Sequence, residues 1–393
     1  MIESSKSSAA QGKLRYGMVG GGEGAFIGDV HRKTAAFDGK CVLTAGAFSR
    51  DYEVTKRTGT ALGLEAGRLY PDFAAMAAEE GQRADGIDFA VIAAPNYVHY
   101  DAAKAFLENG IHVVCEKPLT FTVAQAEALK QLEALKQLVA EKGLLFCVMY
   151  SYSGYPMLHQ ARRMVQEGEI GEVLMVMGEY PQDWLMGLME DESRQAAWRT
   201  DPKMAGCSNC TGDIGSHIEH TAAFVTGLKI KRLLARLDII GAGRVLDTNS
   251  AVLLEYGNGA TGMYWSSQVA AGNDNALKLR VYGAKGSIEW EQEFPNVLRF
   301  TQAGEPTRTL CRGHGYLYPD AASRLPSGHS EGYFEAFSNI YSRFADAVLK
   351  LKAGEALTAA DLDFPNVDDG IAGVKFISAC VESAKNDSKW ITV

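Results

Sequence analysis

The chain has 393 residues, of which 47% are hydrophobic and 22% charged, a globular composition at a length that usually divides into two domains. Its formal net charge is -9 and it has no long basic run, so nucleic acid is not an expected partner. No apolar run is long enough to cross a bilayer, and we expect no membrane association.

The N-terminal residues and the cysteines bear on the cellular compartment of the protein. Residues 1–12 are rich in Ser and Ala and have no apolar core, so we expect a loose leader, not a signal peptide. The seven cysteines are scattered through a large chain. Reduced thiols in a cytoplasmic protein are the default for that pattern, and we predict a cytoplasmic location.

A glycine cluster follows the first apolar run and precedes a helical pattern. Gly20 and Gly22 supply two glycines of a G-x-G-x-x-G fingerprint, but its last position is Ala25, and Gly28 is a better third glycine. The turn either ends at Ala25 or carries a three-residue extension, with the helix starting near Phe26. We favour the extension. Such a turn brings backbone N–H groups and the positive end of a helix to a pyrophosphate.

Strands and helices then alternate as far as residue 150. Near-continuous apolar strands separated by helices indicate a parallel sheet covered on both faces. We therefore predict an α/β Rossmann doubly wound domain over residues 13–150 that binds NAD(P). The expected strands after the first are 41–49, 86–95, 111–115 and 144–150, and the expected helices are 26–37, 54–62, 97–109 and 123–142.

The last of these helices contains a duplication, because residues 127–132 are repeated without change as residues 133–138. Six residues rotate the helix by roughly 240° at 3.6 residues per turn, so the two copies cannot present the same face. We interpret the repeat as a local lengthening of a surface helix. A partner-binding helix is the alternative.

Beyond residue 150 consecutive strands with short turns predict an α+β domain with a large, mostly antiparallel, open-faced sheet. We expect this domain over residues 151–393, with helices on one face of the sheet, the other face available to another subunit, and the C-terminal helix able to pack back on the first domain. The expected strands are 173–180, 233–240, 250–256, 259–269, 276–283, 286–291 and 297–301, and the expected helices are 157–167, 218–226 and 333–352.

Two short segments carry the predicted chemistry. Lys117, in Glu116-Lys117-Pro118, follows a predicted strand at the sheet edge where ligands bind, and it could stabilise a developing alkoxide. Asp213 and His217 are four residues apart, so on a helix both would lie on one face, suited to orienting a substrate and moving a proton. The alternatives are a surface Lys before a Pro, an N-capping Asp and a surface His.

Together these segments resemble the glucose-fructose oxidoreductase, inositol dehydrogenase and rhizopine catabolism (Gfo/Idh/MocA) family. The resemblance rests on the glycine turn with residues 28–31, on 95–99, on 116–118 and on 212–217, in that order, and it covers nearly the whole chain from Leu14. It implies an NAD(P)-dependent dehydrogenase or reductase that acts on a sugar, cyclitol or related polyol. It also implies a homo-oligomer, a dimer or tetramer, formed through the C-terminal sheet.

The resemblance assigns catalytic roles to Lys117, Asp213 and His217. His217 would accept the proton of a secondary hydroxyl while its carbon gives hydride to the nicotinamide, Lys117 would stabilise the alkoxide, and Asp213 would position the sugar. We predict cofactor contacts at Gly20, Gly22, Ala25, Phe26, Ile27, Ser49, Arg50, Pro95, Asn96, His99, Glu116 and Lys117. Weaker substrate candidates are Tyr150, Tyr152, Trp184, Arg199 and His329, some of them in the loops 181–203 and 314–329 expected to set specificity.

The end of the second strand bears on the choice between NAD and NADP. An acidic residue there would hold the ribose of NAD, but the sequence reads Ser49-Arg50-Asp51. Ser49 and Arg50 could receive a 2′-phosphate, while Asp51 could still reach a ribose. The sequence therefore leaves both cofactors open.

Two other functions are weighed. Cys207, Cys210, His217 and His220 are zinc-ligand types, but their spacing differs from that of standard fingers, and we predict no metal site. A non-catalytic sugar or nucleotide sensor could use the same fold. All three catalytic residue types are present, which argues against a sensor.

Overall fold

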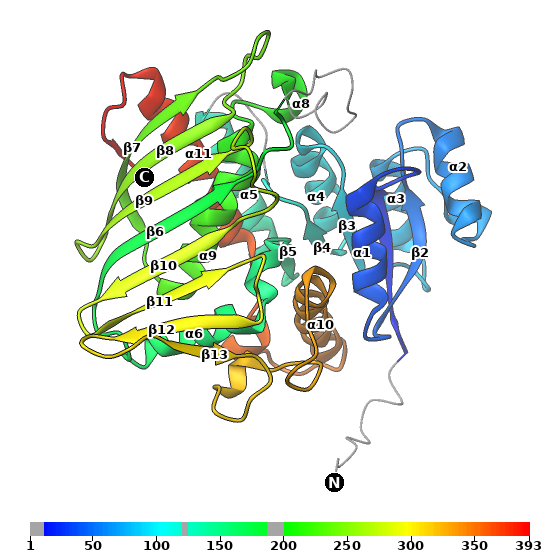
Figure 1. The fold of residues 1–393 in the computed structure, drawn as a ribbon. Coiled ribbons are helices and arrows are strands. Elements are labelled where there is room, and N and C mark those ends of the chain that lie inside the picture. The colour runs from blue at the N-terminus through cyan, green and yellow to red at the C-terminus, as the bar shows by residue number, and fades with distance from the viewer. Residues whose placement is uncertain (1–11, 120–124, 187–199) are drawn as a thin grey trace.

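The computed structural model describes residues 12–119, 125–186 and 200–393, in which two sheets lie next to each other with helices around them (Figure 1). Nearly all of the predicted leader lies outside these residues. No helix in the described ranges is long and apolar enough to pass through a bilayer.

The first sheet is parallel, as predicted, and its strand order is β2-β1-β3-β4-β5. Apolar side chains project from both of its faces into two separate clusters of buried residues, so helices must cover both sides. Helix α3 follows the N-cap Asp72 and was not among the predicted helices. The elements are β1 (Leu14–Gly20), α1 (Phe26–Ala36), β2 (Cys41–Ala47), α2 (Tyr52–Ala61), α3 (Phe73–Gln82), β3 (Phe89–Ala93), α4 (His99–Glu108), β4 (His112–Cys115), α5 (Gln125–Lys142) and β5 (Phe146–Val148).

The second sheet is mixed and mostly antiparallel, with order β13-β12-β11-β10-β6-β9-β8-β7-β14, and only its β6–β9 pair is parallel among the described strands. Figure 1 views this sheet from one face, with α6, α9 and α11 packed behind the other. The edge strands β13 and β14 were not predicted. The strands are β6 (Val173–Pro181), β7 (Ile230–Asp238), β8 (Asn249–Tyr256), β9 (Thr261–Ser267), β10 (Lys278–Gly283), β11 (Gly286–Glu291), β12 (Val297–Gln302), β13 (Arg308–Cys311) and β14 (Ile391–Thr392).

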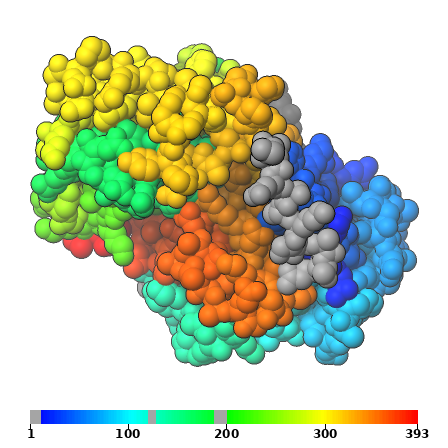
Figure 2. Space-filling model, turned by 90° about the horizontal axis from the view of Figure 1, so that it is seen from below, coloured from blue at the N-terminus to red at the C-terminus, as the bar shows by residue number. Residues whose placement is uncertain are grey.

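Two late helices connect the parts built on the two sheets. The helix α10 (Tyr333–Lys352) packs along α1, and its apolar side chains complete the cluster on that face of the first sheet. The helix α11 (Val367–Lys385) packs on both α5 and β7. Figure 2 shows the orange end of α10 and the segment after it between the green and yellow residues of the second sheet and the blue residues of the first. The other helices of this half are α6 (Pro156–Gln166), α8 (Pro202–Ala205) and α9 (Ser216–Thr226).

The glycine turn fits the predicted three-residue extension: α1 begins at Phe26, directly after Ala25, and Gly28 in its first turn packs against the turn as the third glycine. Gly20 has φ +75°, a left-handed conformation that favours glycine. Gly28 lies against the turn so closely that a Cβ there would be 2.3 Å from the Cα of Gly21. The extension therefore leaves Gly28 to provide the close packing of helix against turn.

The duplicated segment lies within α5, and its copies present different faces, as the 240° rotation predicts. Ala128 in the first copy is buried, whereas the equivalent Ala134 in the second is exposed. Leu132 closes the first copy in the core, and its equivalent Leu138 is only partly buried.

We predict that Gly28→Ala lowers the free energy of unfolding by about 2 kcal/mol, because the new methyl group overlaps backbone that cannot move without disturbing β1. Urea unfolding followed by circular dichroism measures the change. Gly67→Ala is the control, since a Cβ at Gly67 meets nothing within 4 Å. Equal stability of the two variants would contradict the packing role of Gly28.

Candidate active site

A cavity of about 480 Å³ lies between the two sheets, and residues from both halves of the chain line it. The first half contributes the start of α1 and the segments after β3 and β4. The second half contributes the end of β6, the start of α9 with the turn before it, the loop before β10 and the start of α10. Carboxyl ends of parallel strands are where open α/β sheets bind ligands, so this cavity has the expected position.

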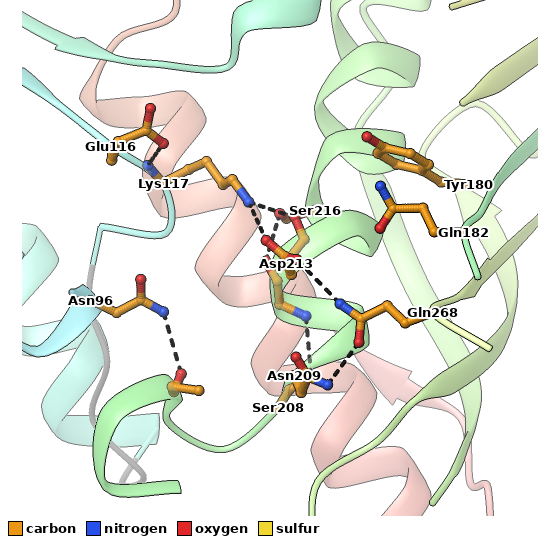
Figure 3. A network of polar contacts seen from close by, with 12 residues as sticks. Asn96, Glu116, Lys117, Tyr180, Gln182, Ser208, Asn209, Asp213, Ser216 and Gln268 are labelled. Carbon is orange, nitrogen blue, oxygen red and sulfur yellow. Dashed lines mark hydrogen bonds and ion pairs between the residues drawn. The ribbon is translucent and has the colours of Figure 1, made fainter. Parts of the chain in front are cut away.

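Lys117 and Asp213 meet inside this cavity (Figure 3). Lys117 follows β4, and its Nζ donates to Asp213 Oδ1 at 2.9 Å and to the Asp213 carbonyl oxygen at 2.6 Å. Their side chains are 12% and 16% exposed, so each charge needs the other. Two residues predicted from separate motifs are thus an ion pair.

A chain of amides continues from Asp213. Gln268 Nε2 donates to Asp213 Oδ2 at 3.2 Å, and Asn209 Nδ2 donates to Gln268 Oε1 at 2.7 Å. Because an ionised carboxylate only accepts, it fixes which way both amides face. Asn209 Oδ1 is left as a buried acceptor without a hydrogen-bond partner among the described residues. Sequence reasoning missed Gln268 and Asn209, since neither belongs to a recognised motif.

The segment that carries Asp213 is a π-helical turn, η4 (Thr211–Gly215), which runs directly into α9. Buried Asp247 holds its start: Oδ1 accepts from the Asn209 backbone N–H at 2.8 Å, and Oδ2 accepts from the backbone N–H and the hydroxyl of Thr211, both at 2.8 Å. A carboxylate at the N-terminus of a helical segment satisfies N–H groups that lack partners there. Asp247 therefore orients the catalytic candidates without lining the cavity.

His217 lies one turn after Asp213, on the same side of the helix, and lines the cavity. Its ring packs against Tyr152 at a centroid distance of 4.7 Å and against the edge of Tyr150 at 5.8 Å. Burial, followed by the nearby Lys117 charge, holds the pKa of His217 well below its ordinary value. The imidazole is therefore neutral at physiological pH and able to accept a proton.

A polar wall lies beside His217 in the cavity and is defined here by Tyr152, Tyr180, Gln182 and Asn275. The hydroxyls of Tyr152 and Tyr180 are hydrogen-bonded to each other, and Asn275 Oδ1 accepts from Tyr180 at 2.5 Å and from Gln182 at 2.7 Å. Trp184 Nε1 donates to Gln182 Oε1 at 3.0 Å. Tyr152 and Trp184 were predicted near the substrate. Tyr180, Gln182 and Asn275 were missed because they are isolated polar residues near strand ends.

Two of the residues predicted to contact the cofactor line the end of the cavity near the glycine turn. Phe26 and Ile27, at the start of α1, lie in the cavity wall, and no side chain caps that helix start, so its N–H groups are available to a pyrophosphate. The turn is tight, since a Cβ at Gly22 would be 2.9 Å from the Phe48 carbonyl oxygen. Ala25 is the N-cap residue. The structure therefore fits a dinucleotide at this turn.

The other predicted cofactor contacts form two groups. Asn96 and Glu116 line the cavity, while His99 lies in its wall with Nδ1 2.7 Å from the Pro118 carbonyl oxygen; Pro95 precedes Asn96 at the end of β3. Ser49 and exposed Arg50 follow β2, beside the glycine turn and outside the cavity wall. This is the place where a second-strand residue would meet the adenosine ribose.

Three of the weaker substrate candidates are not found in the wall of the cavity among the described residues. Tyr150 is fully buried behind His217 and stacks on His220 at 4.2 Å, so it does not line the cavity. His329 is exposed on the loop before α10 and is not part of the cavity wall. Arg199 lies outside the described residues. Tyr150 and His329 were predicted from residue type alone, which does not show where a side chain points.

The zinc alternative finds no support in the geometry. Cys210 Sγ is 3.5 Å from the Ser266 hydroxyl, and the His220 ring stacks on Tyr150. Over the described ranges, no group of three or more His, Cys, Asp or Glu side chains is placed to hold a metal ion.

The chain matches two family models and a full-length relative. Residues 14–143 match the oxidoreductase family with an NAD-binding Rossmann fold, and residues 158–289 match the GFO/IDH/MocA C-terminal domain. The uncharacterized oxidoreductase YfiI of Bacillus subtilis (strain 168) is 40% identical over 385 residues, which cover 96% of each protein.

Solved structures are similar over the same length. An inositol dehydrogenase homolog from Azotobacter vinelandii complexed with NAD+ superposes with a TM-score of 0.92 at 38% identity, covering 97% of each chain. A second structure of an inositol dehydrogenase homolog from Azotobacter vinelandii, complexed with NADH and myo-inositol, has a TM-score of 0.90 at 37% identity. The match covers 97% of this chain and 98% of the other. Levoglucosan dehydrogenase in complex with NADH and levoglucosan has a TM-score of 0.80 at 25% identity, and the match covers 97% of this chain and 100% of that structure. The fold, the site and these matches show that the chain belongs to the Gfo/Idh/MocA family of NAD(P)-binding oxidoreductases.

Proposed function

We propose that the protein transfers hydride between nicotinamide C4 of NAD(P) and a secondary hydroxyl or ketone carbon of a sugar, cyclitol or related polyol. The observation that carries this proposal is the convergence of Lys117, Asp213 and neutral His217 in one cavity that also reaches the dinucleotide turn. The complexes of similar proteins with myo-inositol and levoglucosan support the substrate class.

In this proposal one residue accepts the proton and another stabilises the negative charge. His217 accepts the proton of the reacting hydroxyl, because its imidazole is neutral. The ammonium of Lys117, fixed by Asp213, stabilises the negative charge that develops on the substrate oxygen. The nicotinamide, when bound, supplies the hydride acceptor. In the reverse direction the same groups return a proton to the ketone oxygen.

The rest of the cavity suits a ligand with many hydroxyl groups. Amide and phenol groups of the polar wall offer both donors and acceptors. Trp184 and Phe337 add apolar surface for the faces of a ring. Such a mixture of few polar groups on an apolar lining is usual for small-molecule sites.

We also propose that two copies of the chain associate through the outer face of the second sheet. Leu253, Met263 and Met177 lie in register across β8, β9 and β6, and Leu253 and Met263 are 47% and 40% exposed. Ion pairs flank this row, among them Arg280 to Glu179 at 3.0 Å. An apolar centre with a charged rim is typical of subunit interfaces.

We predict that His217→Asn lowers kcat for polyol oxidation by roughly 10²- to 10⁴-fold, because an amide cannot take the proton. The panel comprises inositols and sugars with NAD+ and with NADP+, and NADH formation is followed by absorbance. Glu79→Gln, an exposed side chain on α3 that belongs to no predicted site, is the control. Full turnover in His217→Asn would contradict the assignment, and binding of coenzyme without turnover by any substrate would favour the sensor.

The low pKa of His217 predicts a particular pH profile. A base is active when unprotonated, so a lowered pKa keeps it active as the pH falls. A histidine with its ordinary pKa near 6.5 would lose about three quarters of its base form by pH 6. We expect kcat/KM at saturating NAD+ to change little between pH 8 and pH 6. An inflection near 6.5 would contradict the neutral, buried histidine.

For the proposed interface, we predict that Leu253→Lys dissociates the oligomer, since the charge would be buried at the apolar centre. Size-exclusion chromatography with light scattering measures the mass. Leu62→Lys, at an exposed position after α2 in the other half of the chain, is the matched control. An unchanged oligomeric mass of Leu253→Lys would contradict an interface at this face of the second sheet.

A further inference from the structure

Glu116 is connected through one buried histidine to a tyrosine from the far end of the chain. His31 Nε2 lies 2.9 Å from Glu116 Oε1, and His31 Nδ1 lies 2.6 Å from the Tyr341 hydroxyl oxygen. His31 and Tyr341 are almost fully buried. The three residues come from α1, the end of β4 and α10, so this Tyr341–His31–Glu116 relay joins the dinucleotide helix to the cavity wall.

The hydrogen bonds define the protons of the relay. We assign the Tyr341 O–H as donor to Nδ1, which places the imidazole proton on Nε2, where it donates to the Glu116 carboxylate. The backbone N–H of Lys117 donates to the other carboxylate oxygen at 3.2 Å. In this tautomer both oxygens of Glu116 are held by donors.

Glu116 is ionised, and its charged neighbours do not cancel its negative charge inside the cavity. Burial raises the pKa of Glu116, but the contact with His31, and after it the Lys117 charge, outweigh burial, so the pKa lies below its ordinary value and the group is ionised. The Lys117 ammonium is directed to Asp213. Burial lowers the pKa of His99, the other titratable neighbour, so that its ring is uncharged.

The position of Glu116 places this charge on the path of the coenzyme. A pyrophosphate at the start of α1 and a reacting carbon beside Lys117 and His217 require the nicotinamide end to span the space between them. Glu116 lines the cavity on that span, next in sequence to Lys117. The oxidised nicotinamide ring carries a positive charge and the reduced ring carries none, so a fixed carboxylate interacts differently with the two.

We propose that Glu116, positioned by His31 and Tyr341, makes the protein bind the oxidised coenzyme in preference to the reduced one. This inference rests on the proposed function, since it requires a nicotinamide in the cavity. The relay residues His31 and Tyr341 act through Glu116 and are positioning residues. Preference for the oxidised form would help release of the reduced coenzyme and retention of the oxidised coenzyme during polyol oxidation.

The test compares binding of the two redox states. The dissociation constant of NADH is measured by fluorescence titration of the full chain, and that of NAD+ by competition. We expect Glu116→Gln to raise the ratio Kd(NAD+)/Kd(NADH) by about tenfold, the effect of one partly screened charge interaction of about 1.4 kcal/mol. Glu79→Gln removes an exposed carboxylate from the same half of the chain and should leave the ratio unchanged.

A double-mutant cycle tests the relay. Tyr341→Phe should raise the ratio by a smaller factor, because His31 stays in place but loses its fixed proton. In the Glu116→Gln background the same change should have no further effect on the ratio. Tyr16→Phe removes another buried phenol from the same apolar cluster and is the control for core disturbance. Thermal unfolding checks that each variant folds.

Three outcomes separate the possibilities. A rise in the ratio with Glu116→Gln, with no further rise when Tyr341→Phe is added to it, supports the proposal. Equal weakening of NAD+ and NADH would overturn it, because the carboxylate would then hold a neutral group such as a ribose hydroxyl. Failure of the unaltered protein to bind either coenzyme would instead contradict the proposed function itself.

Discussion

The ion pair between Lys117 and Asp213 is the interaction on which the rest of the site depends. Its two members are 96 residues apart and come from different halves of the chain, yet both are mostly removed from water. A buried charge without its partner is strongly unfavourable, so this contact determines how the turn before α9 meets the end of β4. Once it forms, His217 is directed into the cavity, and the amides of Gln268 and Asn209 have only one arrangement that satisfies the carboxylate.

The surrounding structure serves to hold these charges still. Asp247 fixes the backbone from which Asp213 projects, and the relay through His31 fixes the neighbouring Glu116. In the proposed reaction, Lys117 thus lies near the reacting oxygen, Glu116 lies near the path of the coenzyme, and the neutral base His217 lies against aromatic rings. Preorganised groups of this kind stabilise charge without rearranging during the reaction, which is the usual source of electrostatic catalysis.

Much of this arrangement was predictable from sequence because it depends on local patterns. Apolar strands between helices predicted the parallel sheet, and the extended glycine turn was located from Gly28 alone. Lys117, Asp213 and His217 belong to recognisable segments, and the structure brings them together. Their catalytic roles stay predictions. Helix α3 was missed because its short Ala-rich stretch has little amphipathic pattern, and β13 and β14 because edge strands are short.

The residues that sequence reasoning missed act through long-range contacts. Gln268 and Asn275 are single polar residues near strand ends, and only the folded chain shows that they face the cavity or its carboxylate. Conversely, Tyr150 and His329 have suitable chemistry, but one is buried behind His217 and the other is exposed outside the cavity wall. Residue type predicts what a side chain can do, whereas packing decides what it meets.

The most direct test of the account is an isotope measurement. The protein is incubated with NAD+ and a polyol carrying deuterium on its CH–OH carbons, and the reduced coenzyme is analysed by mass spectrometry and NMR. The account predicts deuterium at nicotinamide C4 with the unaltered protein and very little product with His217→Asn. Saturable binding of NADH with no transfer of deuterium from any inositol or sugar would contradict it, and the cavity would then serve recognition without hydride transfer.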